Sequence, residues 1–259
     1  MEENMLKTSW KQRLIIILVA IVLLGSSIAV YVAIVLNGGN STSSNNTDLA
    51  AIEKEYEAKN SEYEARAAEV SKKYLDEFSS YRSSVKAYNA ETVNSGAVTH
   101  TDLKEGTGET ITADSTNYSA YYIGFCANEE IFDSSFDDYD NPTSLKAPLE
   151  VQPDQLIEGW YLGVDGMKVG GVREIAIAGS LAYGDSQEIC GGLSSPLKFI
   201  IMAVEKDAEL AKLNSELEEI SNRYMAAYYS SMSSDENSSD EDIEVEEDDS
   251  TEEAGASEE

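Results

Sequence analysis

The chain has few of the residue types on which metal sites and nucleic-acid surfaces depend. Its 259 residues include two cysteines and one histidine, which are too few to favour a zinc site with four nitrogen and sulfur ligands. Acidic residues number 49 against 18 basic ones, which gives a net charge of −31. A nucleic-acid surface needs clustered basic residues to neutralise phosphates, so the composition argues against nucleic acid as a partner.

Two stretches lack the residues of a complete ligand-binding motif. The acidic stretch DDYDN, at 137–141, lacks the glycine and the closing glutamate of a calcium-binding loop. The glycine-rich stretch GVDGMKVGG, at 163–171, does not have the G-x-G-x-x-G spacing of a phosphate-binding turn. We therefore expect the protein to use no metal and no cofactor.

One long apolar run lies near the N-terminus. Residues 14–36 are 23 consecutive uncharged residues, and about 20 apolar residues span a bilayer as a helix. A cleaved signal peptide has an apolar region of only about 7–15 residues and a small-residue cleavage site, which this run does not match. Basic residues lie in segment 1–13 but not in the flexible polar linker at 37–47, so the positive-inside rule places only residues 1–13 in the cytoplasm. The sequence predicts a single-pass anchor in the cell membrane, with the C-terminal part extracytoplasmic.

The C-terminal segment, residues 231–259, contains 14 acidic residues and no basic residue. Like charges repel one another along such a run, and its few apolar side chains cannot form a core, so we expect a disordered acidic tail. We interpret it as a solvated segment without a specific ligand. The alternatives are a solubilising brush and a weak site for cations or basic partners.

Two segments have the periodicity of helices with one apolar face. Residues 48–90 lack glycine and proline, and their apolar residues recur every three or four positions. Residues 206–230 repeat apolar residues in a heptad pattern, at Leu210, Leu213, Leu217, Ile220, Tyr224 and Ala227. Each apolar face must be buried, and the pattern leaves open whether the helices pack within one chain or in a homodimer.

Residues 97–205 have the ordinary length of one domain. Three stretches rich in β-branched and aromatic residues predict strands, at 118–127, 170–178 and 197–205. Between the first two strands, LIEGWYLGVDGMKVGG (156–171) places Trp160 among five glycines. Because glycine weakens both helices and strands, this stretch predicts turns arranged around a buried aromatic ring.

The motifs of this domain resemble those of the FKBP-type peptidyl-prolyl isomerases. The matching stretches are YYIGF…IFDSSF (121–136), QLIEGWYLGVDGMKVGGVREIAIAGSLAYG (155–184) and PLKFIIMAVE (196–205), and their order and spacing agree over nearly all of 97–205. The resemblance implies an α+β fold, in which a half-open antiparallel β-sheet wraps around a short helix. In this chain, long N- and C-terminal helices and one transmembrane helix would flank that domain.

The resemblance also implies roles for individual residues. Six match the catalytic pocket of the family: Tyr122, Phe132, Asp133, Trp160, Tyr183 and Phe199. Leu156, Ile157 and Trp160 would begin the short helix, with the indole as the pocket floor. The Tyr183 hydroxyl and the Ile157 N–H would donate to substrate carbonyls. Rotation about an X–Pro bond breaks no covalent bond, so an apolar pocket that binds the twisted amide better than the planar one suffices for catalysis.

Three positions depart from the family pattern. Ala147 stands where many members have a wall phenylalanine, which predicts a pocket open on one side. The loop 136–146 is longer and acidic, and it holds no arginine to pair with the pocket aspartate. The usual Ile-Pro-Pro before the last strand is replaced at 189–197, where Ile189 or Leu193 would supply the missing aliphatic contact.

Cys126 and Cys190 lie outside the membrane in the predicted topology, where disulfides persist. Family geometry places one at the end of a strand beside the pocket and the other in the loop before the last strand. The resemblance therefore implies a Cys126–Cys190 disulfide.

The sequence as a whole predicts a membrane-anchored, extracytoplasmic prolyl isomerase. Its partners would be proline-containing unfolded or nascent exported polypeptides, and its flanking helices would hold clients or form a homodimer. The competing hypothesis is a catalytically weak FKBP-like binding module or holdase chaperone.

Overall fold

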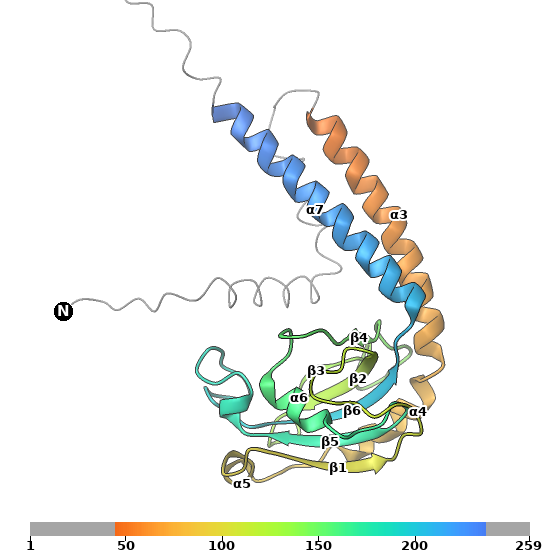
Figure 1. Cartoon of the computed structure of the whole chain (residues 1–259). Coiled ribbons are helices and arrows are strands. Elements are labelled where there is room, and N and C mark those ends of the chain that lie inside the picture. The colour runs from red at the N-terminus through yellow and green to blue at the C-terminus, as the bar shows by residue number, and fades with distance from the viewer. Residues whose placement is uncertain (1–44, 237–259) are drawn as a thin grey trace, which may run out of the picture.

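The computed structural model describes residues 45–236, with side chains for residues 49–230. The chain forms a sheet domain from which two long helices project as an arm (Figure 1). The helices of the arm are α3 (Asn45–Lys72) and α7 (Ala208–Glu236). The domain comprises α4 (Leu75–Ser80), η1 (Tyr81–Ser84), α5 (Ala90–Asn94), β1 (Val98–Lys104), β2 (Tyr118–Phe125), β3 (Ile131–Ser134), β4 (Leu149–Glu150), α6 (Glu158–Val164), β5 (Val172–Ile177), η2 (Gly179–Leu181) and β6 (Leu197–Glu205).

The strands form one antiparallel sheet in the order β1-β5-β6-β2-β3, and β4 pairs with β2. The three strands predicted from composition are confirmed as β2, β5 and β6, with ends within about two residues of those expected. β1 was not predicted, because most of its side chains are exposed and its sequence, VTHTDLK, lacks an apolar alternation.

The two faces of the sheet bury two separate cores, as the two-residue period of a strand requires. Along β2, Tyr118 and Ala120 face the core that contains α6, whereas Tyr121, Ile123 and Phe125 face the core covered by α4. β6 divides its side chains in the same alternating way. The first core contains Trp160 of α6, and the candidate site lies on this side of the sheet.

The single helix expected over 48–90 is wrong, because the structure breaks it after Lys72. The reason is that the apolar residues of this segment pack against two different surfaces, α7 and the sheet. Upstream of the break, Ala67 and Val70 pack against α7; downstream, Phe78 is fully buried on the sheet and stacks on Phe136, with ring centroids 5.3 Å apart. The change of direction between these two surfaces ends α3.

The apolar faces of α3 and α7 pack against each other within one chain (Figure 1). Leu213, Leu217 and Ile220 of α7 are buried, and ion pairs along the arm include Arg66–Asp207 at 2.7 Å and Lys59–Glu216 at 3.0 Å. Of the two alternatives that the heptad pattern left open, the structure shows the intrachain contact.

The ends of the chain bear on the predictions for the acidic tail, the cytoplasmic segment, the anchor and the linker. α7 continues to Glu236, past the residue at which the acidic tail was expected to begin, because no glycine or proline ends the helix earlier. Residues 237–259 lie outside the described residues, as do the predicted cytoplasmic segment, the anchor at 14–36 and most of the linker. Within residues 45–236, no helix has the length and apolar character needed to cross a membrane.

Candidate active site

The helix α6 lies directly on β5, and its glycines make this close approach possible. A Cβ atom at Gly159 would lie 2.2 Å from Ile177 Cγ2, and one at Gly163 would lie 2.9 Å from Ile175 Cδ1. Any side chain at these positions would push the helix away from the strand. The glycines therefore surround Trp160 because the indole, one residue after Gly159, must sit deep between helix and sheet.

Arg173 of β5 holds the other end of α6. Its side chain is buried, and Nη1 donates to the carbonyl oxygens of Gly163 at 3.1 Å and Asp165 at 2.9 Å. These carbonyls belong to the last turn of the helix, where no intrahelical donor remains. Nε is paired with Asp102 at 2.6 Å. The prediction from sequence missed this residue, although an arginine within the apolar stretch GVREIAIA is a signal of a buried partner.

Four of the predicted aromatics meet above α6. Trp160 is 2% exposed, and its ring contacts Phe199 and Tyr122 edge to face at 5.5 and 5.8 Å between centroids. Phe132 contacts Phe199 in the same geometry at 5.5 Å. The indole N–H donates to the Tyr118 hydroxyl at 3.3 Å, which fixes the plane of the ring. The arrangement is an aromatic floor with aromatic walls, as the resemblance implied.

Asp133 places a carboxylate beside this aromatic group. Its Oδ2 accepts a hydrogen bond from the Tyr122 hydroxyl at 2.5 Å, and its Oδ1 accepts one from the Ser134 N–H at 2.8 Å. Burial and the nearby Asp133 charge raise the pKa of Tyr122 well above its ordinary value. The same two causes raise the pKa of Tyr183. Both hydroxyls therefore stay protonated and able to donate at neutral pH.

Two hydrogen-bond donors at the site have no acceptor among the described residues. They are the hydroxyl of Tyr183, which is half-buried against the aromatic core, and the backbone N–H of Ile157, which precedes α6. Tyr161, which sequence reasoning missed, orients the segment before α6. Its hydroxyl accepts the N–H groups of Gln155 and Leu156 and donates to the Gln152 carbonyl at 2.6 Å. The neighbouring N–H of Ile157 is left for another acceptor.

The remaining predicted residues divide into those at the site and those away from it. Leu156 and Ile189 pack against the aromatic core, whereas the Leu193 side chain is 50% exposed, so of the two aliphatic candidates Ile189 is the one that lies at the site. Ala147, the position at which an open pocket wall was expected, does not lie among the residues of the aromatic core. It packs against Ala67 and Val70 of the arm, because the loop that carries it turns toward α3.

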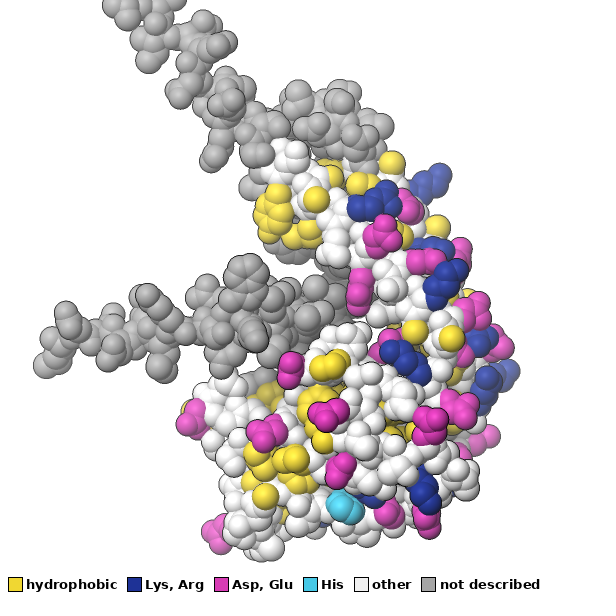
Figure 2. All heavy atoms as spheres, viewed as in Figure 1, with side chains coloured by type: hydrophobic (Ala, Val, Ile, Leu, Met, Phe, Trp, Pro, Cys, Tyr) yellow, Lys and Arg dark blue, Asp and Glu magenta, His cyan; other side chains and the backbone are white. Residues whose placement is uncertain are grey.

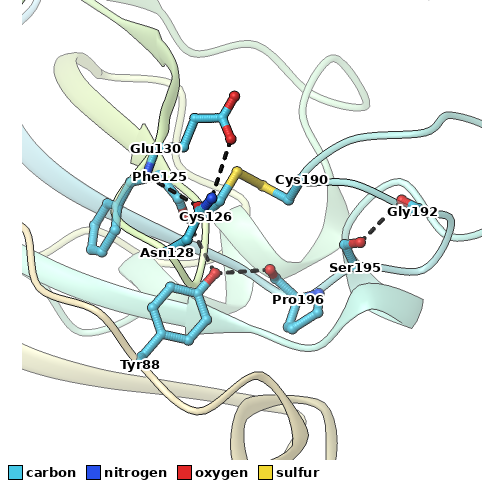
Figure 3. The surroundings of a disulfide bond; sticks show 9 residues. All are labelled: Tyr88, Phe125, Cys126, Asn128, Glu130, Cys190, Gly192, Ser195 and Pro196. Carbon is cyan, nitrogen blue, oxygen red and sulfur yellow. Dashed lines mark hydrogen bonds between the residues drawn. A yellow bond between two sulfur atoms is a disulfide. The ribbon is translucent and has the colours of Figure 1, made fainter.

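The disulfide implied by the resemblance is present. Cys126 and Cys190 are bonded, with their Cα atoms 5.3 Å apart (Figure 3). The bond ties the end of β2 to the loop that carries Ile189. The Tyr88 hydroxyl lies beside it and donates to the carbonyl of Pro196 at 2.9 Å, so the start of β6 is held from the same side.

Several known proteins are similar to this chain. The family model described as FKBP-type peptidyl-prolyl cis-trans isomerase matches residues 108–204. An FK506-binding protein of Streptomyces anulatus is 39% identical over 108 residues, which cover 40% of this chain and 79% of the relative. An FK506-binding protein of Neisseria meningitidis serogroup A is 32% identical over 112 residues, which cover 42% of this chain and 94% of the relative. The protein in the crystal structure of AtFKBP13 is 28% identical in sequence to this chain. The match covers 42% of this chain and 93% of the AtFKBP13 chain, with a TM-score of 0.34.

The two bacterial relatives match over most of their own length, so the chain belongs to the family of FKBP-type peptidyl-prolyl cis-trans isomerases. It is accordingly an isomerase of prolyl peptide bonds. The family is the one that the sequence motifs indicated, and it covers the domain but not the helical arm.

Proposed function

We propose that the aromatic group around Trp160 is the catalytic pocket, and that it binds an X–Pro bond in its twisted form. One observation supports this most strongly: Tyr122, Phe132, Trp160 and Phe199 form one group of contacting aromatic rings, and two donors without acceptors, on Ile157 and Tyr183, belong to residues packed against the same core. A proline ring fits the apolar floor, and the Ile157 N–H and Tyr183 hydroxyl would hold the carbonyls on either side of it.

Isomerisation requires little from the protein beyond an apolar pocket and these donors, because no covalent bond is broken. The planar amide is separated from the twisted one by about 18–20 kcal/mol because resonance is lost on rotation. The twisted amide is less polar than the planar one, so an apolar pocket favours it, and oriented donors hold the flanking chain in place. These interactions lower the barrier only in so far as they bind the twisted form better than the planar form.

We further propose that the protein is a membrane-anchored folding factor with its isomerase domain outside the cytoplasm. The uncharged run at 14–36 and the basic residues before it support this location. The Cys126–Cys190 disulfide adds support, because such bonds persist mainly in oxidising compartments. The clients would be exported polypeptides whose folding is limited by proline isomerisation, which takes tens of seconds or longer without catalysis.

The location is tested by fractionation of expressing cells. Full-length protein should stay in the membrane fraction after carbonate extraction, and protease added to the outside of sealed cells should digest the isomerase domain. Release from the membrane by carbonate, or complete protection from external protease, would contradict the location.

The role in folding is tested by refolding a protein that has one slow proline-limited phase. The full-length protein at a molar ratio of about one to a hundred should accelerate that phase, because a catalyst turns over. The competing holdase hypothesis predicts no acceleration and suppression of aggregation only at near-equal molar amounts. Such a result would replace the folding-catalyst role by the holdase role.

A further inference from the structure

Asp133 is a carboxylate in an aromatic site without a cationic partner among the described residues. Its oxygens accept hydrogen bonds from the Tyr122 hydroxyl and the Ser134 N–H, and both of these groups are neutral. No lysine or arginine within residues 45–230 forms an ion pair with it. A partly buried carboxylate in this position keeps an unmet attraction for a positive charge.

The basic residue on the adjoining loop is engaged elsewhere. Lys146 donates its Nζ to the carbonyl oxygen of Ser134 at 2.8 Å. This acceptor is a backbone carbonyl, and no hydrogen bond or ion pair joins Lys146 to the Asp133 side chain. Lys146 lies in the loop that turns toward the arm, where its carbonyl accepts from the Ser71 hydroxyl at 2.9 Å. It therefore does not neutralise the Asp133 carboxylate.

The Asp133 charge acts on the two hydroxyls of the site. It contributes to the raised pKa of both Tyr122 and Tyr183, as a negative charge close to their oxygens must. Tyr183 is one of the two donors proposed to hold the substrate backbone. A substrate bound there lies within the field of Asp133.

The rim of the site carries further negative charge. Glu158 begins α6 next to the Ile157 N–H, and Asp185 and Glu188 lie on the loop between Tyr183 and Ile189. On the face shown in Figure 2, acidic side chains surround the hydrophobic groups near α6, while lysine and arginine gather toward the arm. The exposed rim charges are screened by salt and would attract any cation weakly. The Asp133 carboxylate, in contrast, is held at a defined position in the proposed pocket and could pair with one cationic group there.

We propose that Asp133 makes this isomerase selective for substrates with lysine or arginine immediately before proline. The basic side chain supplies the cation that the Asp133 carboxylate lacks, while the proline ring occupies the aromatic floor. The inference rests on the proposed function, because it requires the X–Pro bond to bind in this pocket.

The test uses NMR exchange spectroscopy, which measures cis–trans rates without a coupling protease and its own specificity. Full-length protein in detergent is assayed with three peptides that differ only before proline: lysine, acetyl-lysine and glutamate. Acetyl-lysine keeps the length of lysine but removes its charge, so it is the matched control. We expect kcat/KM for the lysine peptide to exceed that for acetyl-lysine about three- to tenfold, the range of a partly exposed charge-assisted hydrogen bond. Glutamate should give the lowest value.

Two variants assign the preference to one residue. Asp133→Asn keeps the shape and an acceptor for the Tyr122 hydroxyl but removes the charge, and it should bring the lysine and acetyl-lysine values to within about twofold of each other. Asp114→Asn removes the same charge from an exposed loop near the opposite end of α6, where the Ala113 N–H donates to Asp165, and should keep the wild-type ratio.

Equal rates for lysine and acetyl-lysine in the wild type would overturn the inference while leaving the proposed function intact. A preference that persists in Asp133→Asn would overturn the assignment to Asp133. Absence of catalysis with all three peptides would overturn the proposed pocket function, and the inference with it.

Discussion

Trp160 and Tyr183 differ in how far each affects the stability of the fold and the binding of a ligand. Trp160 is buried and held by Phe199, Tyr122 and the Tyr118 hydroxyl, so its position depends on the core. The ring of Tyr183 packs against the core, but its hydroxyl has no acceptor among the described residues and is therefore available to a ligand. Replacing Trp160 should therefore lower both stability and activity, whereas removing the Tyr183 hydroxyl should lower activity alone.

The change Tyr183→Phe should reduce activity without reducing stability. We expect kcat/KM for a proline-containing peptide to fall about two- to tenfold, the range of one hydrogen bond. The free energy of unfolding should change by less than about 0.5 kcal/mol, because no bond within the described structure is lost. Both are measured on the full-length protein, by exchange rates and by urea unfolding. Tyr229→Phe, at an exposed position on α7, is the control, and equal activities for the two variants would contradict the role of Tyr183.

The sequence predicted most of the site residues but not their supports. Tyr122, Phe132, Trp160 and Phe199 lie together as expected because they belong to regular strands and a short helix with matching spacing. The surroundings of Ala147 were not predicted, because this residue packs on the helical arm and not at the aromatic core. Such a contact depends on a part of the chain that the family motifs do not cover.

At the scale of elements, the site depends on how closely α6 lies on β5. The contact at Gly159 leaves no room for a Cβ atom, and Arg173 bonds the last carbonyls of the helix. Alternating apolar residues made the strands predictable, but neither close packing nor a buried guanidinium has a periodic pattern. The supports of α6 could therefore be found only from the structure.

Gly159→Ala should lower both stability and activity. The added methyl group would meet Ile177 Cγ2, so α6 or β5 must shift. Overpacking of this kind costs about 1–3 kcal/mol in the free energy of unfolding, and the shift moves Trp160 with the helix. Urea unfolding and the near-ultraviolet circular dichroism of tryptophan measure the two effects. Gly166→Ala is unsuitable as the control because Gly166 has a positive φ. Gly96→Ala is the control, because a Cβ atom there would lie at an ordinary contact distance, 3.5 Å from the Val93 carbonyl oxygen. Equal loss in both variants would contradict the close-packing argument.

The pair of Asp102 and Arg173 should make stability depend on pH. The guanidinium bond lowers the pKa of Asp102 below its ordinary value of 3.8. A lowered pKa means that the contribution to stability is complete above pH 3.8 and is lost as pH falls through the lower, folded-state value. Asp102→Asn should therefore be less stable at pH 7, by about 1 kcal/mol because the carboxylate is half-exposed and screened.

The difference in unfolding free energy between wild type and Asp102→Asn should shrink below about pH 4. Urea unfolding at pH 7, 5, 4 and 3 follows it. A difference that stays constant over this range would show that the ion pair does not stabilise the fold.

At the scale of the whole molecule, the helical arm is joined to the domain through its own base. Ser71 of α3 bonds Tyr121 of β2 at 3.0 Å, and α7 follows β6 with only two residues between them. The base of the arm contacts the sheet on the face of Tyr121, whereas the proposed pocket lies on the opposite face, in the core that contains Trp160. The periodicity of the sequence predicted both helices but not their pairing. A heptad pattern buries its apolar face equally well against a helix of the same chain or of a second chain.

Leu217→Ala should loosen the arm while sparing the pocket. Leu217 is 7% exposed in the contact between α7 and α3, and removal of such a side chain costs about 2–5 kcal/mol of local stability. Hydrogen exchange of the α3 and α7 amides should rise, while kcat/KM for a short peptide stays within about twofold of the wild type. The matched control, Ala226→Ser on an exposed face of α7, should change neither quantity. A loss of peptide activity in Leu217→Ala would contradict the independence of the two parts.

The central claim is that the pocket around Trp160 catalyses prolyl isomerisation. The most direct measurement is the NMR exchange rate of a peptide with leucine before proline, with full-length wild type, Trp160→Leu and Phe132→Ala. Phe132 lies at the partly exposed wall, so its variant should fold even if Trp160→Leu does not. The account predicts catalysis by the wild type and at least a tenfold lower kcat/KM in each folded variant, about 1.4 kcal/mol of lost transition-state binding. A folded wild type that does not catalyse, or variants that catalyse equally well, would contradict it.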